Sequence, residues 1–207
     1  MWITPPNLLT GARVLAVPAM VAAFYLPGAF GKWVTCAIFT AAAVTDYFDG
    51  YLARSWSMQS PFGRMLDPIA DKLLVGAAIL MLVHFDRAPT LPALIILCRE
   101  ILVSGLREFL AEAQVGLPVS RLAKWKTGVQ MVAIAFLIVG TAAPEWLHAD
   151  DIGSYGLWFA AGLTLVTGFD YLLVGLRHST SPSPEEEVAG TRQAMPVART
   201  ARSARGP

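Results

Sequence analysis

Apolar residues occur along this chain in six long stretches separated by short polar segments. Each stretch has roughly 20 residues, which in a helix is long enough to cross a hydrocarbon layer of about 30 Å. The pattern predicts helices near residues 8–27, 33–53, 70–86, 91–111, 127–144 and 153–176. The expected fold class is therefore all-α, an integral membrane bundle of six transmembrane helices.

The amino-acid composition supports a membrane protein. Of the 207 residues, 55% are hydrophobic and only 15% are charged, whereas soluble domains usually carry about 25% charged residues. At Ser179 a segment begins that is rich in Ser, Pro, Ala and Arg and has almost no large apolar side chains. Such a segment cannot bury enough surface to offset its ordering entropy. We predict a membrane domain over residues 1–178 and a disordered cytoplasmic tail over residues 179–207.

Basic residues are distributed unevenly between the two sides of the expected bundle. The only basic residues in the loops after the first and third spans are Lys32 and Arg87. The loop after the fifth span holds Glu145, Asp150 and Asp151 and no basic residue. The opposite side carries a larger basic set: Arg54, Arg64, Lys72, Arg121, Lys124, Lys126 and Arg177. Because cytoplasmic loops are enriched in Lys and Arg, we expect a multi-pass protein of the cell membrane with both termini in the cytoplasm.

The most informative stretch runs from the end of the second expected span into the third. On a helix, five of its residues fall on one continuous face, at i, i+3, i+4, i+7 and i+8: Asp46, Asp49, Gly50, Ala53 and Arg54. Gly50 and Ala53 add no bulk, so a flat ligand has room to approach the backbone between the carboxylates and the guanidinium. This face is a candidate ligand-binding surface.

A second helix begins after a turn and carries two more aspartates. Ser60 and Pro61 are typical of an N-cap and a first helical position. Gly63, Asp67 and Asp71 follow at i, i+4 and i+8, which again is one face. The two helices thus each offer two carboxylates at about the same depth near the cytoplasmic surface.

Four carboxylates at membrane-helix ends need compensating positive charge. A single Asp here is best explained as part of a solvated rim, but an ionised Asp at the centre of a span costs about 2.5 to 3.5 kcal/mol. Arg54, Arg64 and Lys72 offset part of this cost. Hard divalent cations prefer all-oxygen carboxylate clusters. The sequence therefore predicts Mg²⁺ or Mn²⁺, as two ions roughly 4 Å apart that bind a pyrophosphate.

These residues spell D-x2-D-G-x2-A-R-x8-G-x3-D-x3-D, which resembles the signature of the CDP-alcohol phosphatidyltransferase family. Eight residues at fixed spacing make this a specific signal, and the likeness extends over about residues 5–176. It implies a six-helix membrane enzyme that transfers the phosphatidyl group of CDP-diacylglycerol to a small alcohol and releases CMP. The resemblance also implies a homodimer.

The resemblance further implies roles for single residues. Asp46, Asp49 and Asp67 match metal ligands, and Asp71 matches a residue that both touches metal and deprotonates the incoming hydroxyl. We assign the small and polar residues of the stretch to CDP-diacylglycerol binding: Gly50, Ala53, Arg54, Ser60 and Gly63. Of these, Gly50, Arg54 and Ser60 match positions that contact the CDP moiety in the family.

A second charged cluster lies outside the motif, in the fourth expected span. One face carries Glu100, Ser104, Arg107 and Glu108, with Arg99 at its edge. Lysines at helix ends often only snorkel to the interface, but Arg99 lies a turn or more inside its span. Two arginines held by glutamates on one buried face favour an acceptor that carries its own phosphate. The expected acceptor-binding residues are Arg99, Ser104, Arg107, Lys124 and Lys126.

Three segments narrow the resemblance: NLLTGARVLAVPAM, REILVSGLRE and KWKTGVQMVAIAF. They are similar to a bacterial branch of the family whose acceptor is sn-glycerol 3-phosphate. In that branch the N-terminal segment lies near the nucleotide, so Asn7, Thr10 and Arg13 are candidate helpers in CDP-diacylglycerol binding. The alternative for these three is an ordinary helix cap and an interfacial arginine.

Two other functions stay open at this point. An inositol phosphate acceptor would keep every argument about the motif and change only the acceptor pocket. A cation channel or transporter would use the carboxylates for ion passage. Such a protein should place charged residues along a path through the bilayer, whereas here they cluster toward one side.

Overall fold

The computed structural model describes the backbone of residues 5–56, 61–112 and 121–179, and the side chains of residues 11–45, 69, 70, 72–110 and 125–169. The described backbone is helical apart from short turns, and it contains no strand. Its elements are α1 (Pro5–Phe24), α2 (Gly28–Trp56), α3 (Pro61–His84), α4 (Thr90–Glu112), α5 (Arg121–Val139), the 3-10 helices η1 (Gly140–Ala142) and η2 (Glu145–Leu147), and α6 (Ala149–Ser179). The expected all-α fold of six helices is confirmed.

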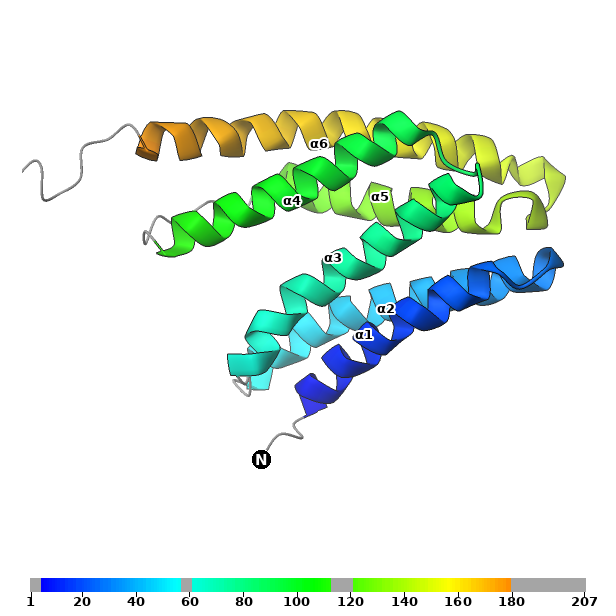
Figure 1. Ribbon diagram of the computed structural model, residues 1–207, viewed down its shortest axis with the longest axis horizontal. Helices are drawn as coiled ribbons and strands as arrows, with labels where there is room; N and C mark the ends of the chain where they lie inside the picture. Colours follow the sequence, from blue (N-terminus) through cyan, green and yellow to red (C-terminus); the bar gives the residue numbers. More distant parts are fainter. Residues whose placement is uncertain (1–4, 57–60, 113–120, 180–207) are drawn as a thin grey trace, which may run out of the picture.

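The six helices run back and forth between two ends of the molecule (Figure 1). Toward the left of this view α1, α3 and α5 begin and α2, α4 and α6 end; the connections α1–α2, α3–α4 and α5–α6 lie toward the right. Helix α6 packs along α5 and α4, helix α1 packs along α2 and α3, and contacts between α2 and α5 join the two groups. The helix ends that carry the aspartate motif therefore share one end of the bundle with the end of α4 and the start of α5.

Apolar side chains occupy both the interior and much of the surface. The interior is filled by fully buried residues from all six α-helices: Met20, Phe39, Leu74, Ile79, Leu82, Ile96, Ile134, Leu137 and Leu157. Large apolar side chains also point outward, among them Leu15, Phe30, Ile101 and Phe159. An apolar exterior suits contact with lipid and is unfavourable in water.

Within the described residues, three helical stretches are long and apolar enough to cross a membrane: Gly28–Thr45, Trp125–Ala142 and Glu145–Phe169. Gly11–Phe24 and Lys72–His84 are shorter apolar helices. In α4, charged residues interrupt the apolar sequence, beginning with Arg99 and Glu100. The chain is thus a membrane protein built on at least these apolar helices.

The region between α5 and α6 differs from the expectation. The fifth helix was expected to reach residue 144, but α5 ends at Val139 because Gly140 adopts a left-handed φ of +46°. A Cβ at Gly140 would lie 2.6 Å from Oδ1 of Asp150, so glycine is the residue that fits this turn. Asp150 and Asp151, expected in a loop, belong to the first turn of α6, where free backbone N–H groups favour negative charge.

The boundary expected between the membrane domain and the tail, after residue 178, lies next to the last described residue of α6. Helix α6 ends at Ser179, one residue beyond the expected boundary. Helix ends commonly differ by one or two residues between criteria. Residues 180–207 lie outside the described part of the chain, so the tail stays a prediction.

Deleting residues 180–207 is expected to leave turnover in detergent unchanged, because this segment lacks the large apolar side chains that form a core. The measurement is the rate of the purified truncated protein, with helicity by circular dichroism as the control. A large loss of rate at unchanged helicity would show that the segment holds a functional element.

Candidate active site

The aspartate motif is carried by two helices that contact each other at one end of the bundle (Figure 1). Asp46 and Asp49 lie in the second half of α2, and Asp67 and Asp71 lie in the first half of α3. Measured along the helix axis, Asp46 lies about 15 Å before the end of α2, and Asp71 lies about 15 Å after the start of α3. Both pairs therefore have the helical spacing expected from the sequence, on neighbouring helices.

The motif side chains themselves lie outside the described residues: Asp46, Asp49, Gly50, Ala53, Arg54, Gly63, Asp67 and Asp71. Ser60 is outside the described backbone, although α3 does begin at Pro61 as expected. Among the side chains that are described, no three acidic, His or Cys groups gather into a metal site. The roles of these residues in metal and CDP binding stay predictions.

Of the three candidate residues in the N-terminal helix, the structure describes the side chain of Arg13. Asn7, Thr10 and Arg13 all lie in α1, and the side chains of Asn7 and Thr10 are outside the described set. Arg13 is buried, with only 3% of its surface exposed. Arg13 is therefore enclosed by other parts of the protein, and its contribution to nucleotide binding stays a prediction.

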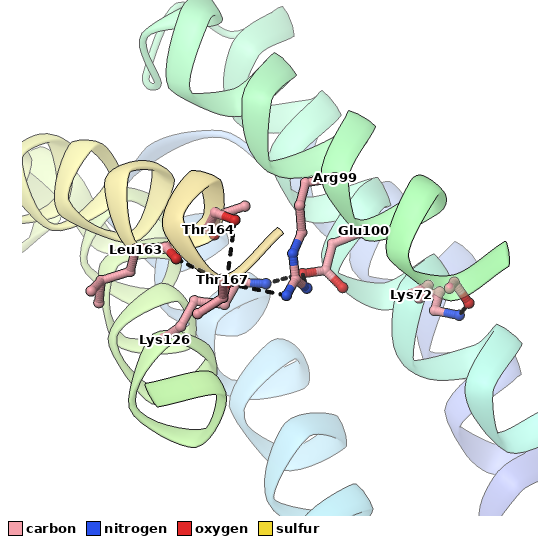
Figure 2. A network of polar contacts seen from close by, with 8 residues as sticks. Lys72, Arg99, Glu100, Lys126, Leu163, Thr164 and Thr167 are labelled. Carbon is pink, nitrogen blue, oxygen red and sulfur yellow. Dashed lines mark hydrogen bonds and ion pairs between the residues drawn. The ribbon is translucent and has the colours of Figure 1, made fainter. Parts of the chain in front are cut away.

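A polar network joins α4, α5 and α6 in the interior (Figure 2). The Glu100 carboxylate accepts hydrogen bonds from Lys126 of α5 and from its neighbour Arg99, whose Nη1 lies 3.4 Å from Oε1. Nη2 of Arg99 donates across to Oγ1 of Thr167 on α6, at 3.2 Å. The Lys126 side chain is 3% exposed, that of Arg99 13% and that of Glu100 26%. Two cations and one carboxylate therefore share a site largely removed from solvent.

A second contact ties α4 to the helix that carries Asp71. Lys72, the next residue along α3, donates to the hydroxyl of Ser104 on α4. Ser104 lies one turn after Glu100, on the same face. In Figure 2 the Lys72 contact lies beside the Arg99 network along α4. The polar face of α4 is thus linked both to the motif helix and to α6.

The expectation of one buried face carrying two arginines is wrong for Arg107. Arg99 is half-buried, but Arg107 and Glu108 are exposed. The reason is the path of α4, which crosses α6 near its start and diverges from it toward its end (Figure 1). Of the other expected acceptor residues, Ser104 and Lys126 lie in the network region, and the side chain of Lys124 is outside the described set.

Three residues of this region, Thr167, Gly168 and Gln130, were not predicted from the sequence. Thr167 contacts Arg99, and Gly168 lies against the stem of the same arginine. Gln130, one turn after Lys126, is buried, and its Oε1 has no hydrogen-bond partner among the described residues. A single Thr or Gln within an apolar helix does not stand out in one sequence as a candidate site residue.

Comparison with known proteins identifies the class to which this helical membrane protein belongs. Residues 3–166 match the CDP-alcohol phosphatidyltransferase family. A protein of Rickettsia felis is 48% identical over 80% of this chain and 92% of its own length. Proteins of Cereibacter sphaeroides (41% identical, 80% of this chain, 92% of the relative) and Pseudomonas fluorescens (40%, 87% and 94%) are similar to it as well. All three are named CDP-diacylglycerol–glycerol-3-phosphate 3-phosphatidyltransferase.

The chain therefore belongs to the CDP-alcohol phosphatidyltransferase family, and the resemblance seen in the aspartate motif is confirmed. It is a transferase of phospholipid biosynthesis. The alternative of a cation channel or transporter is thereby set aside.

Proposed function

We propose that this enzyme transfers the phosphatidyl group of CDP-diacylglycerol to sn-glycerol 3-phosphate and releases CMP. The names of relatives that share 40–48% of their residues with this chain support both substrates. The structural observation that carries the proposal is the Arg99–Glu100–Lys126 network, because an unphosphorylated alcohol would not need buried cations.

The charge of the network suits an acceptor with its own phosphate. Arg99 and Lys126 together outweigh Glu100 by one positive charge, and Lys72 adds another one helix away. A phosphate monoester carries about −1.5 to −2 charges at pH 7. Arg99 offers a planar fork of donors that matches phosphate geometry, and Lys126 offers a point charge. The phosphate would thus replace Glu100 as a partner of these cations or share them with it.

The four motif aspartates are a donor set that fits hard divalent cations. Asp46, Asp49, Asp67 and Asp71 would hold Mg²⁺ or Mn²⁺, which would neutralise the pyrophosphate and the developing charge on the leaving group. Asp71 takes the proton from the acceptor hydroxyl. The resulting oxygen attacks the phosphorus linked to diacylglycerol, its bond to CMP breaks, and CMP carries away the electron pair. Such chemistry depends mainly on positioning and electrostatic stabilisation.

The distribution of charge supports a proposed orientation in the membrane. We infer six spans with the motif and both termini on the cytoplasmic side. The water-soluble glycerol 3-phosphate and CMP would then enter and leave the site from the cytoplasm. The basic residues near the α2–α3 and α4–α5 connections support this orientation. A homodimer is part of the proposal by family resemblance alone.

Lys126→Met is expected to weaken acceptor use selectively. It removes one buried charge at nearly constant shape and leaves Glu100 paired with Arg99. The loss of a charge-assisted hydrogen bond of about 1.5 to 3 kcal/mol corresponds to roughly 10- to 150-fold in kcat/KM for glycerol 3-phosphate. The KM for CDP-diacylglycerol should stay near that of the wild type.

The matched control is Lys32→Met, since Lys32 contacts Thr141 at the opposite end of the bundle. Equal losses for glycerol and glycerol 3-phosphate as acceptors would make Lys126 a structural residue. Efficient turnover with inositol phosphate in place of glycerol 3-phosphate would show that inositol phosphate is the acceptor.

A further inference from the structure

The hydroxyl of Thr167 is oriented by its own helix. It donates its proton within α6 and therefore acts as an acceptor toward Arg99. Its Oγ1 lies 2.9 Å from the carbonyl oxygen of Leu163 and 3.3 Å from that of Thr164. A hydroxyl has one proton and carbonyl oxygens only accept hydrogen bonds, so Thr167 donates this proton to a carbonyl oxygen of α6. The lone pairs of Oγ1 are then left for Nη2 of Arg99 at 3.2 Å. Figure 2 shows Thr167 between the α6 carbonyls and the guanidinium.

The next residue, Gly168, allows the arginine to lie against the α6 backbone. A Cβ at this position would be 3.0 Å from Cγ and 3.6 Å from Nε of Arg99. At 3.0 Å, the arginine stem would have to move by a few tenths of an ångström to accept even a methyl group. Glycine is therefore matched to this close approach between a side chain of α4 and the backbone of α6.

We propose that Thr167 and Gly168 are positioning residues for the acceptor phosphate, which they serve by fixing the guanidinium of Arg99. This inference rests on the proposed function, in which Arg99 binds glycerol 3-phosphate. Both residues lie beyond the family-matched residues 3–166 and in the second half of α6. The acceptor site is thus completed by a third helix that carries none of the motif residues.

The geometry explains why α6 matters for the acceptor. Glu100 lies on one side of the guanidinium and Thr167 on the other, and they engage different nitrogens, Nη1 and Nη2. With both nitrogens held, the plane of the guanidinium is set before the phosphate arrives. Positioning of this kind is costly to lose, because a misplacement of about 1 Å can reduce a rate by about 100-fold.

Thr167→Val is the direct test, since it removes the hydroxyl at nearly constant shape. The KM for glycerol 3-phosphate is expected to rise about tenfold, the low end of the loss of a hydrogen bond to a charged group. The KM for CDP-diacylglycerol should not change. Thr167→Ser keeps the hydroxyl and should restore the wild-type KM for glycerol 3-phosphate. Gly168→Ala should raise the same KM through displacement of the Arg99 stem.

Two control variants separate positioning from folding. Thr35→Val removes a buried threonine hydroxyl that donates to the carbonyl of Gly31 at 2.8 Å, far from Arg99 in the sequence. Gly162→Ala adds a Cβ to α6 where nothing lies within 4 Å. Both should leave the KM for glycerol 3-phosphate unchanged.

The assay distinguishes failure of this inference from failure of the proposed function. If the wild type released no CMP in response to glycerol 3-phosphate, the proposed function would be wrong regardless of the variants. If the wild type is active and Thr167→Val raises the KM for glycerol 3-phosphate and the KM for CDP-diacylglycerol together, Thr167 and Gly168 only pack α4 against α6. The same conclusion follows if Thr167→Val and the control Thr35→Val change the KM for glycerol 3-phosphate equally. A wild-type KM for Thr167→Val would overturn the inference as well.

Discussion

Asp49→Asn is expected to lower kcat by at least about 10³-fold at low Mg²⁺, because a metal-bound phosphoryl group depends on several kcal/mol of charge stabilisation. The substitution keeps the size of the side chain and removes its charge. Asp49 lies one helical turn after Asp46 on α2, so the two carboxylates would hold the same ion or neighbouring ions. The affinity for metal should therefore fall together with the rate.

The measurement is the initial rate of CMP release over a titration with Mg²⁺ and, separately, with Mn²⁺. Asp151→Asn is the matched control, since Asp151 is an exposed aspartate in the first turn of α6 at the other end of the bundle. It should show the metal dependence of the wild type. Full activity of Asp49→Asn at limiting Mg²⁺ would rule out its role as a metal ligand.

Asp71→Asn is expected to reduce turnover by about 10² to 10⁴-fold, the usual contribution of a general base. Binding of CDP-diacylglycerol should persist, because the three other proposed ligands, Asp46, Asp49 and Asp67, would still hold metal. Asp71 lies on α3 next to Lys72, which contacts Ser104 on α4, the helix that we propose binds the acceptor. This neighbourhood suits a base that acts on the acceptor hydroxyl.

The second measurement compares binding of CDP-diacylglycerol with turnover for Asp71→Asn and Asp67→Asn. Asp67→Asn should weaken metal and nucleotide binding as well as turnover. If Asp71→Asn lost nucleotide binding to the same extent as turnover, Asp71 would be chiefly a metal ligand, and another group would have to accept the proton.

The helices were predictable because long apolar stretches have few structural solutions, whereas the helix ends depend on local contacts. The end of α5 at Val139 is determined by Gly140 and by the approach of Asp150 from α6, two residues that are apart in the sequence. The charges of Asp150 and Asp151 indicated a loop by composition. Their actual place in a first helical turn reflects the electrostatics of helix N-termini.

The polar network that we propose binds the acceptor was predictable only at its charged residues. Arg99 and Lys126 are unusual within apolar helices, so the sequence indicated them, and the structure brings both to Glu100. Arg107 shares the same helical face, but helical periodicity does not reveal that α4 diverges from α6 (Figure 1). Thr167 was missed because threonine is common in membrane helices and its partner is on another helix.

The proposed function is tested most directly by CMP release from CDP-diacylglycerol by the purified, full-length protein in detergent with Mg²⁺. We predict release that depends on added sn-glycerol 3-phosphate, is poor with glycerol, and yields one phosphorylated lipid product for each CMP. Release without any acceptor, or a preference for serine, inositol phosphate or glycerol over glycerol 3-phosphate, would contradict the account.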